Sequence, residues 1–427
     1  MAEVGDIICG LDIGTTKIAA LIGEVTDKGV EILGVGTSPS DGLRQGVVVN
    51  IEATTGSIAQ AIAEAEQMAA ADVQSVYVGI AGGHIRGFSS LGQVSMRSRE
   101  VTDEDVARVI EQAKAVNIPL DRQIIHTVPL EYIIDGQGQI RDPIGMNGVR
   151  MEVRAHVITA AVTSVQNIVK CCNRAGLEVL EVVLEPIASS TAVLHEDERD
   201  LGVALIDIGG GTTDVAVYSE GSNVYTGVIV MGGHRITQDV AHGLRTSVGE
   251  AEAIKRKHGC ALVSMVENDD LIEVPGVGPR PPREFKRRFL AEIIEPRVEE
   301  IFLLAQQELL ASGCAELAAS GLVITGGATQ MDGMLEIAED IFQMPIRKGI
   351  PTGTMATTAS RSRITLAEGG FSAMIGDPKF ATGVGLVLYG AAHEPLEADV
   401  VPMAARAREP AGPGIGKRMV DWVRDFF

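Results

Sequence analysis

An approximate internal repeat is the strongest constraint on the fold of this chain. Residues 7–25 read IICGLDIGTTKIAALIGEV, and residues 203–221 read VALIDIGGGTTDVAVYSEG. Each copy has an apolar run that ends in Asp, then Ile-Gly and two threonines, and then a second apolar run. Such runs on either side of a glycine turn predict two strands joined by that turn. The repeat therefore predicts two half-molecules of one fold, which start near residues 5 and 201.

Composition narrows the class of protein. The 427 residues include 49 glycines and only 4% aromatic side chains, which is typical of α/β proteins with several domain-sized units. The formal net charge of −21 argues against nucleic-acid binding, because a phosphate polymer would be repelled. The five cysteines form no CxxC pair, which suits a reducing compartment. With no secretory signal and no apolar stretch of about 18 residues, we expect a cytoplasmic chain without a membrane span.

Residues 86–163 differ in sequence pattern from the rest of the first half. Thr102 precedes three acidic residues, and Val101 and Val106 stand on either side of this group, which predicts an N-capped helix. These features, together with the short runs after them, predict an inserted α+β subdomain. Strands are expected over 123–128, 131–135 and 153–163, and helices outside the insertion over 55–71 and 164–175.

A second insertion is expected over residues 238–314. Its loop 275–282 is too rich in proline for regular structure. Residues 284–310 after it predict a long amphipathic helix, with an interruption at Pro296 as the alternative. The second half thus carries an insertion of its own.

The two repeat turns carry the clearest chemical signal. The three glycines at 209–211 remove side chains where the backbone turns, so that successive N–H groups can contact phosphate oxygens. Carboxylates flank both turns and suit Mg²⁺, which is often held through water. The pair of turns predicts a nucleotide phosphate site. The alternative is a pair of purely structural hairpins.

A third glycine element, VITGGATQMDG at residues 323–333, follows an apolar strand and precedes a helical run over 334–342. Its backbone can also approach a ligand closely. The sequence contains no G-x-x-x-x-G-K-[ST] and no early G-x-G-x-x-G, which excludes a P-loop and a Rossmann site.

These motifs together resemble the actin, Hsp70 and sugar-kinase superfamily of two-lobed ATP binders. Within it, the sequence resembles the FtsA family of bacterial division proteins over essentially the whole chain. The resemblance rests on GLDIGTTKI, VVVNIEAT, AEAIKRKHGCAL, RPPREFKRRFLAEIIEPR and the short amphipathic C-terminus. It implies a two-lobed α/β actin-like fold with an inserted α+β subdomain and a C-terminal amphipathic helix. The implied parts are subdomains 1A (5–85 and 164–200), 1C (86–163), 2A (201–237 and 315–390) and 2B (238–314), a flexible linker (391–414) and a membrane-targeting helix (415–427).

The resemblance also implies ATP and Mg²⁺ as ligands. Glu252 and Lys255 would face the adenine and ribose, although an exposed i,i+3 ion pair is the alternative. Glu185 stands where relatives carry a water-activating side chain, and a solvated glutamate at a helix start is the alternative. At most slow ATP hydrolysis is expected. The remaining implied nucleotide residues are Asp12, Gly14, Thr15, Thr16, Lys17, Asp207, Gly209, Gly210, Gly211, Thr212, Thr213, Gly326 and Gly327, with Asp12, Asp207 and Asp214 near the metal through water.

Partners are implied in the same way. Subdomain 2B would receive the C-terminal tail of the tubulin-like protein FtsZ, and subdomain 1C would serve self-association into filaments and later division proteins. A basic cluster in 2B could pair with an acidic peptide. A solvated helix face balanced by glutamates is the alternative. The cluster comprises Arg283, Lys286, Arg287, Arg288 and Arg297.

The C-terminal segment can be interpreted without the family. At about 100° per residue its apolar side chains fall within roughly 160° of arc. Because it follows a proline-rich linker, we expect it to lie in a membrane interface. Docking on the parent domain or a neighbour is the alternative. The apolar face contains Ile415, Met419, Val420, Trp422, Val423, Phe426 and Phe427.

The expected function is therefore that of a membrane-tethering adaptor in cell division. The chain would bind ATP, form filaments, hold FtsZ polymers at the inner face of the cytoplasmic membrane at the division site, and recruit later division proteins. Two alternatives remain: a sugar or acid kinase of the same superfamily, and a related pilus-assembly adaptor.

Overall fold

The computed structural model describes residues 2–267, 270–351, 354–356, 363–365 and 375–393. All structural statements below concern these residues. The predicted membrane helix 415–427, and the predicted linker from residue 394 onward, lie outside them.

The first half is built on a five-stranded sheet with the order β11-β6-β1-β2-β3. Strands β1, β2 and β3 are antiparallel neighbours, and β6 and β11 continue the sheet in parallel from β1. Apolar residues fill both faces of β1, as expected for a central strand. The strands are β1 (Ile7–Ile13), β2 (Lys17–Thr26), β3 (Gly29–Pro39), β6 (Ser75–Ile80) and β11 (Glu178–Leu184).

The second half repeats this topology. Its sheet has the order β14-β13-β12-β17-β18, again with three antiparallel strands followed by two parallel ones. The predicted duplication is thereby confirmed: β1 corresponds to β12, and β2 corresponds to β13. The strands are β12 (Val203–Ile208), β13 (Thr213–Ser219), β14 (Ser222–Ile229), β17 (Leu322–Thr325) and β18 (Ile346–Lys348).

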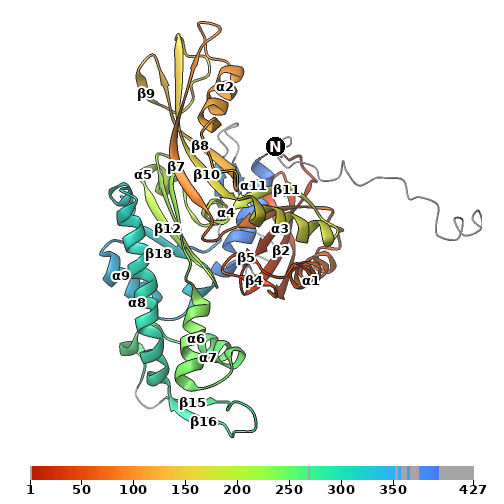
Figure 1. The fold of residues 1–427 in the computed structure, drawn as a ribbon, viewed down its shortest axis with the longest axis vertical. Helices are drawn as coiled ribbons and strands as arrows, with labels where there is room; N and C mark the ends of the chain where they lie inside the picture. The colour runs from red at the N-terminus through yellow and green to blue at the C-terminus, as the bar shows by residue number, and fades with distance from the viewer. Residues whose placement is uncertain (1, 268–269, 352–353, 357–362, 366–374, 394–427) are drawn as a thin grey trace, which may run out of the picture. The chain divides into compact units, whose positions relative to one another are not determined.

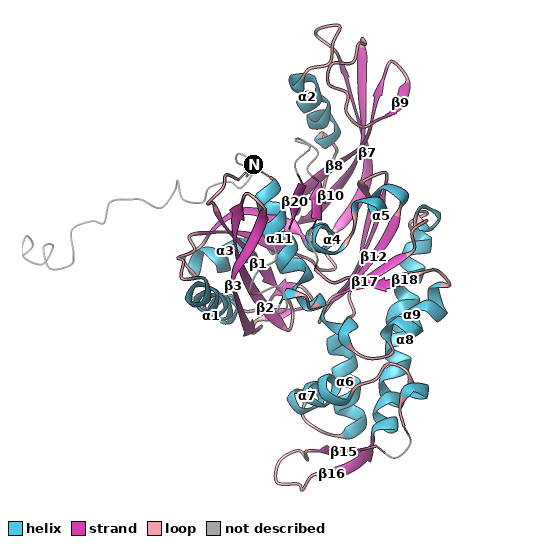
Figure 2. Cartoon of the chain, turned by 180° about the vertical axis from the view of Figure 1, so that it is seen from behind, coloured by secondary structure: helices cyan, strands magenta, loops and turns pink. Residues whose placement is uncertain are grey.

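Helices α4 (Glu185–Val193) and α11 (Ala381–Ala392) lie between the two sheets (Figures 1 and 2) and share one core with residues of both halves, such as Leu21 and Leu205. They cross closely, because a Cβ atom on Gly385 would lie 1.8 Å from the Ala188 carbonyl oxygen. Helix α11 ends at Ala392, so the first two residues of the predicted linker, 391 and 392, are helical.

The other helices pack on the outer faces of the sheets. Helices α1 (Ile51–Ala69) and α3 (Val162–Arg174) bury their apolar sides in the first half. Their positions confirm the helices expected there. In the second half the helices are α5 (Glu196–Leu201), α6 (Gly233–Leu244), α7 (Val248–His258), α8 (Arg287–Ala311) and α9 (Met334–Phe342). Short elements are β4 (Leu43–Arg44), β5 (Val47–Val48), β19 (Thr354–Ala356), β20 (Arg363–Thr365), η1 (Val263–Met265), η2 (Ala315–Leu317), η3 (Gly327–Gln330) and η4 (Pro378–Phe380).

A separate four-stranded sheet, β7-β10-β8-β9, is inserted in the first half and carries helix α2 (Asp103–Lys114). The expected N-cap is present: Thr102 accepts from Asp105 N–H, and the Asp105 side chain accepts from Thr102 N–H. The two short strands expected over 123–128 and 131–135 are instead one strand, β8. Strand β9 pairs only near Tyr132 and Ile134, so Pro129 removes no bond on that side. The strands are β7 (Arg86–Ser95), β8 (Arg122–Ile134), β9 (Gln137–Ile140) and β10 (Arg150–Ala161).

The second insertion ends in a hairpin of β15 (Leu271–Val274) and β16 (Arg283–Lys286). The predicted helix start at residue 284 is wrong, because Arg283–Lys286 pair with β15 and α8 begins at Arg287. The interruption at Pro296 is also absent: α8 continues through it, with Ile294 and Val298 buried on either side. Among the described helices, none is long and apolar enough to cross a membrane.

Candidate functional site

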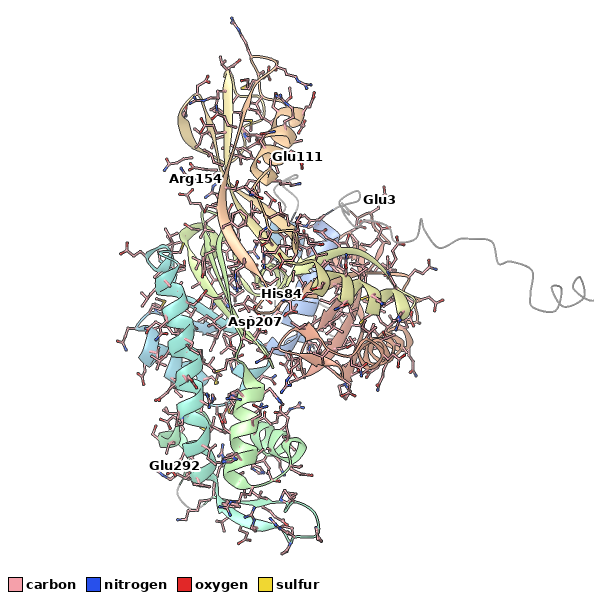
Figure 3. All side chains as sticks on the ribbon, viewed as in Figure 1. Glu3, His84, Glu111, Arg154, Asp207 and Glu292 are labelled. Carbon is pink, nitrogen blue, oxygen red and sulfur yellow. The ribbon has the colours of Figure 1, made fainter. Side chains whose placement is uncertain are left out.

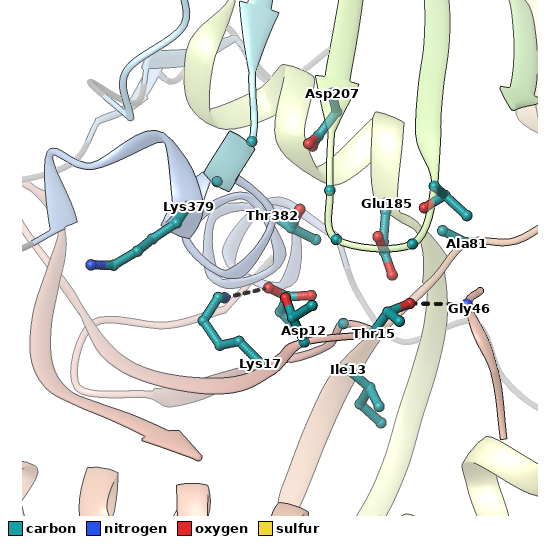
Figure 4. A pocket seen from close by; sticks show the side chains of 18 of the residues that line it. Asp12, Ile13, Thr15, Lys17, Gly46, Ala81, Glu185, Asp207, Lys379 and Thr382 are labelled. Carbon is teal, nitrogen blue, oxygen red and sulfur yellow. Dashed lines mark hydrogen bonds and ion pairs between the residues drawn. The ribbon is translucent and has the colours of Figure 1, made fainter. Parts of the chain in front are cut away.

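The two repeat turns face each other across one pocket (Figure 4). The turn between β1 and β2 forms one wall, and the turn between β12 and β13 forms the opposite wall. The first residues of α4 and α11 and the glycines after β17 complete it. The lining residues are Asp12, Ile13, Gly14, Thr15, Thr16, Lys17, Gly46, Ala81, Glu185, Asp207, Gly209, Gly210, Gly211, Thr212, Gly326, Gly327, Pro378, Lys379 and Thr382.

Both turns are closed by the same backbone hydrogen bond. Gly14 N–H donates to the Lys17 carbonyl at 3.0 Å, and Gly209 N–H donates to the Thr212 carbonyl at 3.0 Å. Each turn thus leaves the N–H groups between these residues available to a ligand. The sequence repeat is therefore also a repeat of local geometry.

The glycines of the second turn are required by the first turn. A Cβ atom on Gly210 would lie 2.5 Å from Thr16 Cγ2, and one on Gly211 would lie 2.4 Å from Thr15 Oγ1. The Thr15 hydroxyl is itself held by Gly46 N–H at 3.1 Å. Side chains at 210 and 211 would push the two halves apart.

Gly326 supports the pocket from β17. It has φ +92°, and a Cβ atom there would lie 2.3 Å from Asp207 Oδ1. A residue with a side chain would be strained in this conformation and would displace the Asp207 carboxylate.

Four carboxyl groups create a strongly negative field around the pocket. Burial, together with Asp12, Asp214 and Asp207, raises the pKa of Glu185 well above its ordinary value. Burial raises the pKa of Asp207 to about 6, and burial followed by the charge of Asp207 raises that of Asp214. Such shifts arise when like charges are close and poorly solvated.

Two lysines supply the positive charge among the lining residues. Lys17 Nζ donates to Asp12 Oδ2 at 2.9 Å, and Lys379 Nζ pairs with Asp377 at 2.9 Å. Both ammonium groups lie over the ring of Phe380, at 5.4 and 4.9 Å from its centre. The aromatic ring fixes the two cations on one side of the pocket.

The carboxylates fit a divalent cation held through water. Asp214 Oδ1 is buried and makes no hydrogen bond to a described residue, so a negative charge there would need a nearby cation. Hard oxygen donors of this kind suit Mg²⁺. Among the described residues, no group of three or more His, Cys, Asp or Glu side chains is placed to hold a metal directly. This arrangement is compatible with water-mediated contact.

Four predicted site residues do not line the pocket: Thr213, Asp214, Glu252 and Lys255. Glu252 and Lys255 form an ion pair of 2.7 Å, but the Lys255 side chain is only 13% exposed. Its Nζ also donates to the Gly233 carbonyl at 3.1 Å and to Thr237. The pair is therefore tied to the start of α6 rather than solvated.

The structure adds Lys379 and Thr382 to the pocket, which the sequence analysis missed. Thr382 lies at the start of α11 and Lys379 lies in η4 just before it, far along the chain from both turns. The only local signal was Asp377-Pro378, whose aspartate caps Lys379 N–H at 2.9 Å and marks a helix start. Gly46 and Ala81 were also missed, and no motif marked them, whereas Ile13 lies within the predicted first turn.

The predicted basic cluster of the second insertion is not one open face. Arg283 donates to the Leu244 carbonyl at 2.7 Å, and Arg287 to the His258 carbonyl at 2.9 Å. Arg288 lies 3.4 Å from Glu292. Arg297 pairs with Asp239 of α6 and with Glu300, three residues along α8. Exposed basic residues of the same region include Arg256 and Lys257 at the end of α7, Arg280 in the loop 275–282, and Arg283 and Lys286 in β16.

The two insertions extend away from this site in Figure 3. Arg154 and Glu111 lie on the first insertion, Glu292 lies on α8 of the second, and Asp207 lies between them.

Comparison with known proteins identifies the family. The family model of the cell division protein FtsA matches residues 204–385, and that of the SHS2 domain inserted in FtsA matches residues 82–159. The cell division protein FtsA of Pseudomonas aeruginosa is 46% identical over 432 residues, covering 100% of both chains. That of Escherichia coli K12 is 41% identical over 430 residues, covering 99% of this chain and 98% of the relative.

Among solved structures, a type IV pilus biogenesis complex of PilM and PilN is similar with a TM-score of 0.64. Its sequence identity is 17%, over 91% of this chain and 99% of that one. The similarity at this identity concerns the fold, which is mixed α/β and actin-like. Because the relatives above are 46% and 41% identical to it over nearly its whole length, the chain belongs to the FtsA family of cell division proteins.

Proposed function

We propose that the pocket between the repeat turns binds ATP with Mg²⁺. The single observation that carries this proposal is the facing pair of identically closed glycine turns inside a cluster of buried carboxylates. Backbone N–H groups of both turns would contact the phosphates, and Lys17 and Lys379 would balance their charge. Asp12 and Asp207, which line the pocket, would hold Mg²⁺ through water, and Asp214, which does not line it, would add its charge from strand β13. The ion would neutralise charge on the phosphates.

Hydrolysis would depend on Glu185. Its carboxyl group stands at the first residue of α4, inside the pocket, where it can hold a water molecule near a bound phosphate. Burial and the neighbouring carboxylates raise its pKa, which favours the protonated carboxyl group in the ligand-free protein. A base that must first lose a proton supports slow turnover at most. The chain would therefore act mainly as an adaptor, and only secondarily as an enzyme.

The second insertion would bind the C-terminal tail of FtsZ. Among the exposed basic side chains, Arg256, Lys257 and Lys286 are best placed for an acidic peptide, because no hydrogen bond or ion pair to another described residue engages them. Arg283 and Arg287 would shape this surface through the carbonyl groups that they hold. Arg297 would stabilise α6 against α8 rather than contact the peptide.

Self-association and recruitment of later division proteins would use the first insertion, our subdomain 1C. Its four-stranded sheet and α2 have a core of their own, which suits a surface module attached to the actin-like body. The subdomain assignments 1A, 1C, 2A and 2B stated above are part of this proposal.

Residues 415–427 would anchor the protein to the inner face of the cytoplasmic membrane at the division site. The support is the apolar face with Trp422, Phe426 and Phe427 in the sequence. Filaments would present many such segments at once, and multivalency would make weak single anchors firm.

Co-sedimentation with FtsZ polymers and liposomes tests this function. We expect the full chain to bring FtsZ into the liposome fraction, and to do so more completely with ATP and Mg²⁺. A chain that lacks 415–427 should bind FtsZ but leave it in the supernatant. Equal recovery of FtsZ with and without the full chain would contradict the tethering function.

A further inference from the structure

The base of the inserted subdomain touches both halves of the molecule. Strand β10 runs from the core of the insertion, where Met151 and Val153 are buried, into the core of the first half, where Ile158 and Ala160 are buried. Strands β7, β8 and β10 also contact β14, the outer strand of the second sheet. One strand therefore joins the core of the insertion to the core of the first half, next to the outer strand of the second sheet.

His156 of β10 and Thr226 of β14 meet at this boundary. His156 Nε2 lies 3.0 Å from Thr226 Oγ1, and the residues expose only 2% and 5% of their surfaces. A Cβ atom on Gly87 of β7 would lie 2.5 Å from the His156 ring and 3.0 Å from Thr226 Oγ1. The close approach of three strands therefore requires glycine at 87. Separation of these strands would leave two buried polar atoms without partners, which is costly.

Strand β14 leads from Thr226 to the second glycine turn of the pocket. Just beyond its end, the Met231 carbonyl accepts a hydrogen bond of 2.8 Å from Thr213 Oγ1. Gly233 N–H then donates to the Gly209 carbonyl at 2.9 Å. The residues that follow β14 are thereby hydrogen-bonded to the second glycine turn and to the strand after it.

His126 of β8 makes the matching connection to the first half. Its Nε2 accepts a hydrogen bond of 2.9 Å from Leu184 N–H, and Leu184 immediately precedes Glu185. Burial lowers the pKa of His126 to about 4, so the ring stays neutral and able to accept. The insertion is therefore hydrogen-bonded to elements that form both walls of the pocket.

We propose that the His156–Thr226 hydrogen bond is a latch that couples closure of the pocket to the orientation of the inserted subdomain. The proposal rests on the proposed function, because nucleotide is the ligand that closes the pocket. In the latched state the halves are close and the insertion is fixed. A partner that binds the insertion in this orientation raises nucleotide affinity by the same factor by which nucleotide raises the partner's affinity. Couplings of this kind are typically on the order of tenfold.

The test compares the full chain with Thr226→Val, which removes the hydroxyl but keeps the shape of the side chain. His156→Gln, which retains a donor, is the conservative variant. Thr54→Val is the matched control, because Thr54 is also buried and its hydroxyl bonds at 2.9 Å to Asn50 within the first half. The measurements are ATP affinity by calorimetry and hydrogen–deuterium exchange over residues 86–95 and 150–161, with and without ATP and Mg²⁺.

We expect ATP to slow exchange in these two segments of the wild-type chain. Thr226→Val should exchange faster there without nucleotide, lose the response to ATP, and bind ATP on the order of tenfold more weakly. His156→Gln should retain part of the response, and Thr54→Val all of it. Equal exchange and affinity in Thr226→Val and Thr54→Val would overturn the latch and leave the proposed function intact. A wild-type chain that binds no ATP would overturn the proposed function and, with it, the latch as stated.

Discussion

Ser189 Oγ donates a hydrogen bond of 2.6 Å to Asp207 Oδ2, which joins helix α4 of the first half to strand β12 of the second. The same hydroxyl lies 3.1 Å from Thr382 Oγ1 on α11. Ser189 thus links α4 and α11, the two helices between the sheets, to the Asp207 carboxylate near the end of β12. The hydrogen bond opposes the rise in the Asp207 pKa that burial causes.

Replacement of Ser189 by Ala should weaken binding of ATP with Mg²⁺ in a pH-dependent way. Without the donor, the Asp207 pKa rises further, and more of this carboxyl group is protonated near pH 6 to 7. Loss of one such bond corresponds to about 1 kcal/mol, or several-fold in affinity. Calorimetry at several pH values should show the deficit shrinking toward pH 8. The neighbouring Ser190→Ala, whose hydroxyl bonds to Tyr218 at 2.6 Å, should show no such pH dependence. A deficit independent of pH would contradict the link through Asp207.

Asp207→Asn should stabilise the ligand-free protein at neutral pH. In the folded chain this carboxyl group keeps its proton up to about pH 6, whereas its ordinary pKa is 3.8. The folded state therefore binds more protons between these values, and stability falls as pH rises through that window. Asn removes this loss, which is at most about 3 kcal/mol at about 1.4 kcal/mol per pKa unit.

Thermal unfolding checks this prediction. The melting temperature of Asp207→Asn should exceed that of the wild type by a few degrees at pH 7, and the gain should vanish near pH 4. Binding of ATP with Mg²⁺ should be lost in the same variant. A variant less stable than wild type at pH 7 would show that the carboxylate is not under electrostatic strain.

Reversal of charge at Lys257 and Lys286 to Glu should weaken binding of an acidic FtsZ C-terminal peptide by about three- to tenfold. Both side chains are exposed, so the fold should persist. Arg297→Ala is the contrasting variant: it should lower stability by at most about 1 kcal/mol through loss of the Asp239 pair and leave peptide affinity unchanged. Fluorescence anisotropy at two salt concentrations distinguishes these outcomes. If only Arg297→Ala weakens binding of the peptide, the binding surface lies on the α6 side of α8.

Replacement of Trp422 and Phe426 by Glu should release the protein from liposomes without a change in ATP affinity. Each large apolar side chain contributes roughly 1.5–3 kcal/mol when buried, so loss of two removes most of the free energy that holds a weak anchor in the membrane. Vesicle flotation measures the effect. Flotation of the variant at wild-type levels would exclude this segment as the membrane contact.

The sequence was sufficient for features whose signal is local. The Asp-Ile-Gly turns predicted both walls of the pocket, because a turn depends on neighbouring residues. The Thr102 cap and the flanking Val101 and Val106 predicted α2 for the same reason. Lys379 and Thr382 escaped prediction because they reach the pocket only through packing of α11 against α4. The residues Arg283–Lys286 follow a helical pattern of charges, and only the pairing with β15, across a loop of eight residues at 275–282, makes them a strand.

The central claim is that the two facing glycine turns form an ATP site, and calorimetry of Gly210→Val tests it most directly. A Cβ atom at this position would lie 2.5 Å from Thr16, whereas Gly249 has no atom within 4 Å of its Cβ position and provides the control Gly249→Ala. We predict that the wild type and Gly249→Ala bind ATP with equal affinity in the presence of Mg²⁺. Gly210→Val should show no detectable binding while keeping a cooperative unfolding transition. Equal ATP affinity of folded Gly210→Val and the wild type would contradict the account.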